Sequence, residues 1–249
     1  MSDVTAPPRS TTSTSAPRAR WPRRERWPRR ERWAVAGLLA LSTVPVLAGA
    51  IRVGELASGP AMTEANARFV SDPAPVVVHI ISATVFSVLG AFQLMPTYRR
   101  RHLRRHRVTG RVVAPAGVVA ALSGVWMTVF YATPVPDGVS LAVVRLVVGV
   151  AMAVFLVLGV RAAVRRDIRS HRGWMIRGYA IGVGAGTQVL TSVPLLLAEG
   201  SPTELLRTAT MALGWLINAV VAEVIIRRGR MLRAGVISPV ARGSLAQPR

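Results

Sequence analysis

The chain has 249 residues, of which 51% are hydrophobic and 17% are charged, yet its formal net charge is +21. Soluble domains carry about 25% charged residues, and here the mean hydropathy is positive, at +0.39. The positive charges fall in short clusters between apolar stretches of roughly 18 to 22 residues, the length that spans a bilayer. Composition therefore excludes an ordinary soluble domain and predicts an all-α polytopic membrane helix bundle.

Two further features of composition narrow the class of protein to which the chain can belong. The chain has no cysteine, which excludes disulfides, thiolate chemistry and Cys-ligated metal. All 32 basic residues are Arg, and with the abundant Ala, Val and Gly this is typical of a high-GC bacterium, so we expect a bacterial inner-membrane protein. A pI near 12.0 is also typical of nucleic-acid-binding proteins. The positive-inside rule accounts for the same charges, so we expect no nucleic-acid partner.

Residues 1–33 are predicted to be a disordered, Arg/Pro/Trp-rich cytoplasmic tail. The first twenty residues are rich in Ser, Thr and Pro and have no apolar pattern that could form a core. The tail ends in "RWPRRERWPRRERW", a repeat that places Trp21, Trp27 and Trp33 at equal spacing. The repeat fits an interfacial anchor, because Trp prefers the headgroup level and Arg is attracted to anionic lipid. It also fits a low-complexity tail with no such role.

Apolar runs predict six transmembrane helices. A signal peptide cleaved after "LAGA" is an alternative for the first run, although its n-region would be unusually long. In chain order the six runs are Ala34–Ile51, Val76–Pro96, Val112–Ala132, Val139–Val160, Gly178–Ala198 and Thr208–Ile226.

The charges alternate between the connections. The first 33 residues and segments 97–111, 161–177 and 227–249 together hold 28 of the 32 Arg residues, whereas the alternate loops are mildly acidic. The positive-inside rule therefore places both termini in the cytoplasm. The predicted organisation is a six-helix transmembrane domain over residues 34–226, followed by a basic cytoplasmic tail over residues 227–249.

Polar side chains are costly within a bilayer, so those in or next to the runs are candidate functional residues. They fall into two layers. The predicted cytoplasmic Arg/His layer consists of Gln93, His106, Arg107, Arg111, His171, Arg172, Trp174, Arg177 and Glu223. The middle and outer layer consists of His79, Arg145, Thr187, Gln188, Thr191 and Asn218.

Glu223 is the only acid within a predicted span. A carboxylate in lipid either protonates or pairs with a cation. Arg111 and Arg177 are predicted at a similar depth, so we expect an ion pair that joins helices, with a proton relay as the alternative. Arg145 is expected to snorkel or to pair toward the outside, at a depth near that of His79.

Three segments resemble a bacterial family of multi-pass membrane proteins filed as domain of unknown function 2306. They read "HIISATVFSVLGAFQLMP", "RRHRVTGR" and "RSHRGWMIRGYA", and the resemblance extends from about His79 to Glu223. Where members of the family often carry Arg after a Thr, this chain reads "GTQVLT", with Gln188. The resemblance implies a multi-helix membrane protein and supplies no reaction.

Three functions are compatible with the Arg/His layer. His106 and His171 could ligate one b-type haem from neighbouring helices, which would make the protein an electron carrier. A divalent metal on His102, His106 and His171 is disfavoured, because seven Arg residues and no acid lie in segment 97–111. Anionic phospholipid headgroups match the Arg side chains as they stand.

We therefore expect the layer to set topology and to contact anionic lipid, with no cofactor and no metal. Haem held by His106 and His171 is the alternative. The chain has no nucleophile–base pair, phosphate loop or nucleotide-binding motif, so we expect no catalytic residue of an ordinary enzyme.

Overall fold

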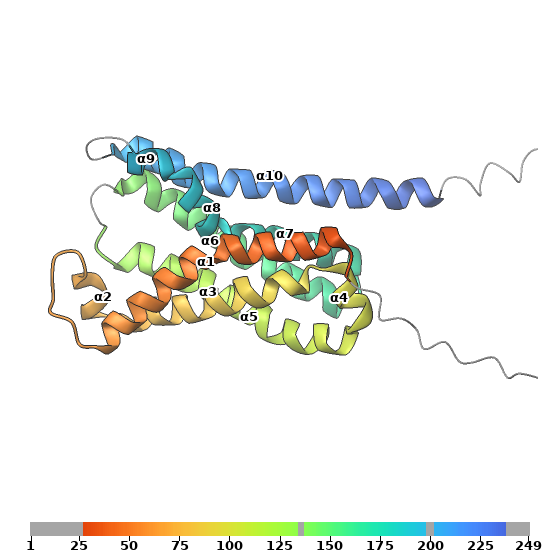
Figure 1. The fold of residues 1–249 in the computed structure, drawn as a ribbon, viewed down its shortest axis with the longest axis horizontal. Coiled ribbons are helices and arrows are strands. Elements are labelled where there is room, and N and C mark those ends of the chain that lie inside the picture. The colour runs from red at the N-terminus through yellow and green to blue at the C-terminus, as the bar shows by residue number, and fades with distance from the viewer. Residues whose placement is uncertain (1–26, 134–136, 198–201, 238–249) are drawn as a thin grey trace, which may run out of the picture.

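A computed structural model describes residues 27–133, 137–197 and 202–237, and all regular elements within these ranges are α-helices. Figure 1 shows them as one elongated bundle. In chain order the helices are α1 (Arg29–Ala57), α2 (Ala67–Ser71), α3 (Pro73–Gln93), α4 (Pro96–Arg101), α5 (Leu103–Phe130), α6 (Gly138–Val164), α7 (Ile168–Gly182), α8 (Gly184–Thr191), α9 (Val193–Leu197) and α10 (Glu204–Ile237).

Five of these helices are long and apolar enough to cross a membrane, namely α1, α3, α5, α6 and α10. Their outer faces are apolar as well. Leu216 and Val147, for example, have 59% and 64% of their surface exposed. An apolar surface of this extent is typical of a face that contacts lipid.

The predicted fifth span is broken into three helices. The α7 helix ends at Gly182, α8 begins at Gly184, and α9 follows from Val193. The break lies where the backbone approaches α10 closely: a Cβ on Gly184 would lie 2.4 Å from the Trp215 ring. Hydropathy detects the apolar content of this segment but not the tight contact that interrupts its hydrogen-bond ladder.

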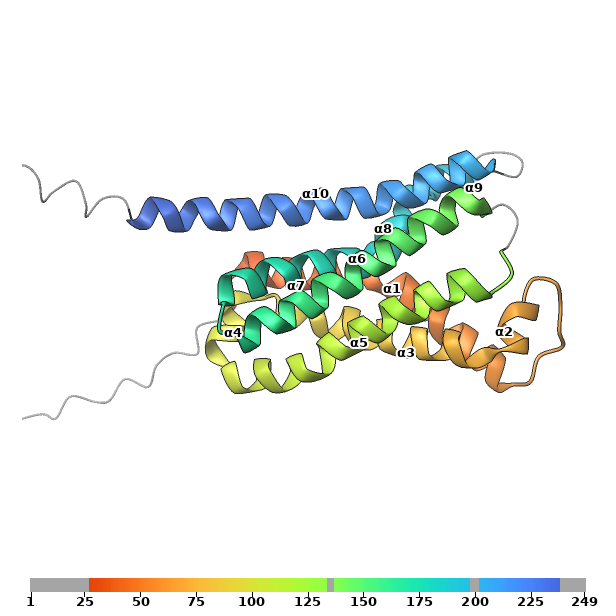
Figure 2. The same ribbon diagram turned by 180° about the vertical axis from the view of Figure 1, so that it is seen from behind.

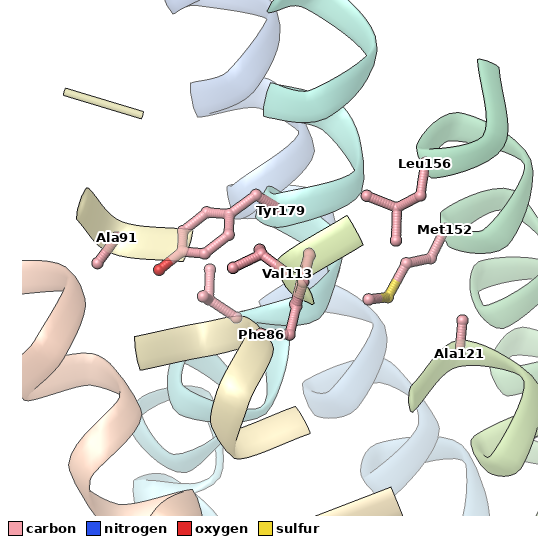
Figure 3. Close-up of a cluster of buried hydrophobic side chains, with 8 residues drawn as sticks. Phe86, Ala91, Val113, Ala121, Met152, Leu156 and Tyr179 are labelled. Atoms are coloured by element: carbon pink, nitrogen blue, oxygen red, sulfur yellow. The ribbon is translucent and has the colours of Figure 1, made fainter. Parts of the chain in front are cut away.

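The core is formed where α7 passes between α3, α5 and α6. Phe86, Leu156 and Tyr179 are almost fully buried there, and Figure 3 shows them among smaller side chains from the surrounding helices. Close approach depends on glycine: a Cβ on Gly117 would lie 2.5 Å from the Phe86 ring. Small residues at such contacts let membrane helices pack closely where no hydrophobic effect drives them together.

The first and last helices extend into both predicted tails. The α1 helix begins at Arg29 and α10 continues to Ile237, so both helices extend past the domain boundaries that the sequence predicts near residues 33 and 227. Arg is a good helix former and its backbone bonds are internal, so a helix can continue past the end of its apolar run. Residues 1–26 and 238–249 of the predicted tails lie outside the described residues.

The two ends of the bundle differ in composition. Figures 1 and 2 show the start of α1, the helix α4 and the end of α10 at one end, which we call the basic end. The short helix α2 and the starts of α6 and α10 lie at the opposite end, which we call the cavity end.

Candidate functional site

His106 and Gln93 lie at the basic end, at the start of α5 and the end of α3. His106 Nδ1 and Gln93 Nε2 are both buried and have no hydrogen-bond partner within the described part of the chain. His171 is near enough for its ring to interact electrostatically with that of His106. A buried polar atom without a partner is uncommon in folded proteins.

A hydrogen bond to the preceding helix, α6, orients the side chain of His171. Its Nδ1 lies 2.8 Å from the carbonyl oxygen of Gly159 in α6. Gly159 is buried against Met175, so α6 and α7 approach closely at this point. The bond fixes the ring orientation. Because it uses Nδ1, Nε2 is the ring nitrogen that can interact with another group.

Glu223 pairs with Arg177. The guanidinium donates two hydrogen bonds to the carboxylate, at 2.5 Å from Nε to Oε1 and 3.1 Å from Nη2 to Oε2. Arg177 also stacks on Trp174, with its Cζ 4.9 Å from the ring centroid. The prediction of an ion pair that joins two helices is confirmed, and of the two predicted cations Arg177 is the one that forms it, between α7 and α10.

The other Arg residues of the predicted layer divide into two groups. Arg107 and Arg111 are exposed on α5. Arg172 lines a small recess of about 50 Å³ between α7 and α10, together with Arg99, Arg169 and apolar side chains that include Ile176. The second group therefore forms a concave basic surface, whereas Arg107 and Arg111 are exposed on the helix.

A contact that sequence reasoning missed joins the start of α1 to α4. The Glu31 carboxylate accepts hydrogen bonds from the backbone N–H and the hydroxyl of Thr97, at 3.0 Å and 2.9 Å, and only 6% of Glu31 is exposed. Trp27 packs edge-on against Tyr98. The feature of the sequence that indicates this contact is Glu31, an acid within an Arg-rich segment.

The cavity end contains the second candidate site, a cavity of about 470 Å³. It extends inward from Arg68 and Arg145 to the core residues Phe86 and Met152, both of which Figure 3 shows. Its walls come from α1, α2, α3, α5, α6, α7, α8 and α10. A cavity of this size, apolar with a few polar groups, is typical of a small-molecule site.

Two Arg side chains converge on Asp137 at this end. It is 3% exposed, pairs with Arg145 at 2.8 Å, and accepts a hydrogen bond from Nε of Arg207. Burial alone would raise the pKa of the Asp137 carboxyl, but the hydrogen bonds and charges of Arg207 and Arg145 outweigh burial and lower it. The predicted outward pairing of Arg145 is confirmed, whereas hydropathy and charge clustering do not predict that Asp137 and Arg207 form the same cluster.

Arg68 adds a further positive charge to the cavity wall. Its Nε is buried without a hydrogen-bond partner within the described residues, and its only hydrogen bond there is a long one, 3.4 Å, to the carbonyl of Ala132. Its guanidinium stacks on Phe69, with Cζ 4.6 Å from the ring centroid. Arg52 stacks on the same ring at 4.9 Å but does not line the cavity.

His79 and Gln188 supply the polar groups farther along the cavity wall. His79 Nδ1 lies 2.9 Å from the carbonyl oxygen of Ala120, so this nitrogen carries the proton and Nε2 is the acceptor of the neutral ring. Gln188 is buried, and its amide nitrogen donates to the carbonyl of Met211 at 3.0 Å, which leaves the amide oxygen as acceptor. Both residues line the cavity.

The remaining polar residues of the predicted outer layer stabilise the broken helix. Thr187 donates to Asn218, and Asn218 donates to the carbonyl of Ala180 at 2.9 Å, close to the end of α7. Thr191 donates to the carbonyl of Thr210. Side chains that satisfy backbone groups at a break are what makes such a break tolerable in a membrane.

The described residues contain no group of three His, Asp or Glu side chains that could hold a metal ion. His106 and His171 line neither the cavity nor the recess.

These features define a polytopic helical membrane protein. Residues 76–226 match the family described as "Predicted membrane protein (DUF2306)", and the chain belongs to this family. The resemblance found in the sequence is therefore confirmed. No curated protein and no solved structure matches the chain.

Proposed function

We propose that the protein crosses the bacterial inner membrane six times with both termini in the cytoplasm, and that its basic end binds anionic phospholipid headgroups. Five crossings are the long apolar helices, and the sixth is the broken segment α7–α9. An even number of crossings is consistent with the start of α1 and the end of α10 lying at the same end of the bundle (Figure 1). The concentration of Arg at that end favours the cytoplasmic side.

The observation that supports lipid binding is the recess between α7 and α10. No carboxylate of the described residues lies within ion-pair distance of Arg169 or Arg172, and both line the recess beside Ile168 and Ile176. Guanidinium groups bind phosphate through paired hydrogen bonds. Apolar side chains next to them suit the first part of an acyl chain, and basic pockets between helices on the cytoplasmic side bind lipid headgroups in this way.

Retention of endogenous lipid by purified full-length protein tests the lipid site. Arg172→Gln should reduce co-purified phosphatidylglycerol and cardiolipin by roughly fivefold, since one Arg near an anionic surface contributes about 1 kcal/mol. Arg107→Gln is the matched control, because it removes the same charge from an exposed site at the same end. Equal losses in the two variants would show that net charge, and not the recess, holds the lipid.

Labelling of single cysteines tests the topology, because the natural chain has none. A membrane-impermeant maleimide added to intact spheroplasts should label Ser58→Cys and Pro202→Cys but not Arg165→Cys. The pair Arg165 and Pro202 flanks the broken segment, so labelling of both, or of neither, would contradict the sixth crossing.

The haem alternative has one observation in its favour: among the described residues the buried His106 Nδ1 has no hydrogen-bond partner, and His171 is near it. An absorption spectrum of the same preparation tests it. We expect a colourless protein, and a stoichiometric Soret band lost in His171→Ala would replace the lipid proposal with haem binding.

A further inference from the structure

We propose that the cavity at the other end of the bundle is a binding site for a small anionic amphiphile, with its anionic group at Arg68 and Arg145 and its apolar part directed toward Phe86. This site is separate from the lipid recess and shares no residue with it. The charge at the mouth of the cavity, its apolar depth and the unused hydrogen-bond acceptors in its wall suit such a ligand.

The charges at the mouth have a positive excess. Arg145 and Arg207 share the single carboxylate of Asp137, and Arg68 adds another guanidinium. Arg68 interacts favourably with Asp137, but Arg145 and Arg207 share that carboxylate, and Arg68 also interacts unfavourably with Arg145 and with Arg52, whose own partner is Glu55. Two further acids lie nearby but do not line the cavity: Asp72, near Tyr131, and Glu204, whose carboxylate accepts hydrogen bonds from Ser140. An anion at the mouth would offset the repulsion between the guanidinium groups.

Arg68 has hydrogen-bond donors that could bind such an anion. Its Nε has no partner within the described residues, and a buried N–H left without an acceptor is unfavourable. The planar guanidinium can donate two parallel hydrogen bonds to a carboxylate or a phosphate. Arg145 lines the same mouth but already pairs with Asp137, so Arg68 is the residue whose bonding an anion would complete.

The deep, apolar part of the cavity indicates that the ligand also has an apolar part. From Arg145 to Met152 along α6 the cavity wall rises seven residues, or about 10 Å at the helical rise per residue. Phe86 and Met152 are at its inner end and Trp215 lines it from α10 (Figure 3 shows the first two). An inorganic anion would leave this apolar volume unfilled, so the ligand must carry an apolar chain or ring system.

The two unused acceptors indicate a further feature of the ligand. Nε2 of His79 and the amide oxygen of Gln188 both belong to residues that line the cavity, and no hydrogen bond occupies either atom among the described residues. A ligand with a hydroxyl or N–H group on its apolar part could donate to them. The site therefore suits an anionic amphiphile, and its anion can be a carboxylate or a phosphate.

Quenching of Trp215 by an ω-brominated decanoate provides a direct test. The full-length protein is reconstituted in phosphatidylcholine nanodiscs and titrated with the probe, whose bromine should quench Trp215 at saturation. Trp215→Phe should remove the saturable part of the signal and leave only non-specific quenching of the other Trp residues. Decanoate and decyl phosphate should displace the probe, and the more effective of the two identifies the anion.

The headgroup requirement is tested with two Arg variants. Arg68→Gln should weaken probe binding by about tenfold or more, the size expected for charge-assisted hydrogen bonds. Arg52→Gln is the matched control, since it also stacks on Phe69 but lies outside the cavity, and it should have a far smaller effect. Equal effects of the two variants, or displacement of the probe by decanol as effective as by decanoate, would overturn the proposal.

A cavity-filling variant separates binding from folding. Ala83 lines the cavity from α3, so Ala83→Phe should abolish saturable quenching while the protein stays folded, as judged by gel filtration and helical circular dichroism. If Ala83→Phe does not fold, Ala142→Leu, from the α6 wall, serves the same purpose. Saturable quenching retained in a folded, filled variant contradicts the assigned site.

Discussion

Arg side chains are arranged differently at the two ends of the bundle. At the cavity end, Arg145 and Arg207 converge on Asp137, which is 3% exposed, and the three join α6 to α10. At the basic end, most Arg residues are exposed, and the pair of Arg177 with Glu223 is partly accessible, with 23% and 37% of the two side chains exposed. Buried charges depend on their partners far more than exposed ones do.

Because burial differs, we expect the ion pairs of the cavity end to contribute to stability and the exposed Arg residues of the basic end to contribute to lipid binding. A buried carboxylate between two guanidinium groups is a structural contact whose loss leaves charge uncompensated. Exposed Arg clusters contribute little to folding but attract anionic surfaces and set orientation. Both ends are basic and both contain a buried acid, but two Arg residues converge on Asp137 at the cavity end, whereas Glu31 at the basic end accepts hydrogen bonds from Thr97. Four predictions test this difference, in order of expected effect.

Asp137→Asn should have the largest effect. It leaves Arg145 and Arg207 adjacent without their carboxylate, and breaking a buried pair costs about 3–5 kcal/mol. Because both guanidinium groups are about a third exposed, we expect the lower part of this range. Reversible unfolding in mixed micelles of mild detergent and SDS, followed by Trp fluorescence, measures the change. A loss below about 1 kcal/mol would place Asp137 among ordinary surface pairs.

The contribution of Asp137 should depend on pH. Its pKa is lowered in the folded protein, so its stabilisation is complete above the unfolded pKa of about 3.9 and is lost as pH falls through the folded value. The difference in unfolding free energy between the natural chain and Asp137→Asn should therefore be constant from pH 5 to 8 and shrink below pH 4. A difference that already shrinks between pH 7 and 5 would contradict the lowered pKa.

Glu31→Gln should have an intermediate effect. The change removes the charge from two hydrogen bonds to Thr97 at the start of α4, which we expect to cost about 1–2 kcal/mol. Arg32→Gln, an exposed neighbour, is the control. A chain that starts at residue 34 should lose at least as much as Glu31→Gln, whereas one that starts at residue 27 should unfold as the natural chain does.

Glu223→Gln should have the smallest effect, about 0.5–1 kcal/mol, because its pair with Arg177 is partly exposed. The same unfolding assay and the same acid-to-amide change make it directly comparable with Asp137→Asn. If the two variants lose equal stability, the contrast between the two ends of the bundle is wrong.

Charge clusters predicted the basic end, but only the folded chain shows which residues meet there. Both Arg111 and Arg177 were candidate partners for Glu223, since both are near its depth. The structure selects Arg177, because α7 packs against α10 at this point, while Arg111 is exposed on α5. Depth follows from position along each segment, whereas pairing also depends on which helices are neighbours and how each is rotated.

The sequence by itself determined the membrane class, the six apolar segments, the clustering of Arg and the family resemblance. These are local properties, since hydropathy and charge are read from one segment at a time. The tertiary structure decided the break between α7 and α8, the burial of Asp137 between Arg145 and Arg207, and the cavity. Each of these needs residues distant in the sequence to meet, and side chains from α2, α6 and α10 surround one space only after the helices have packed.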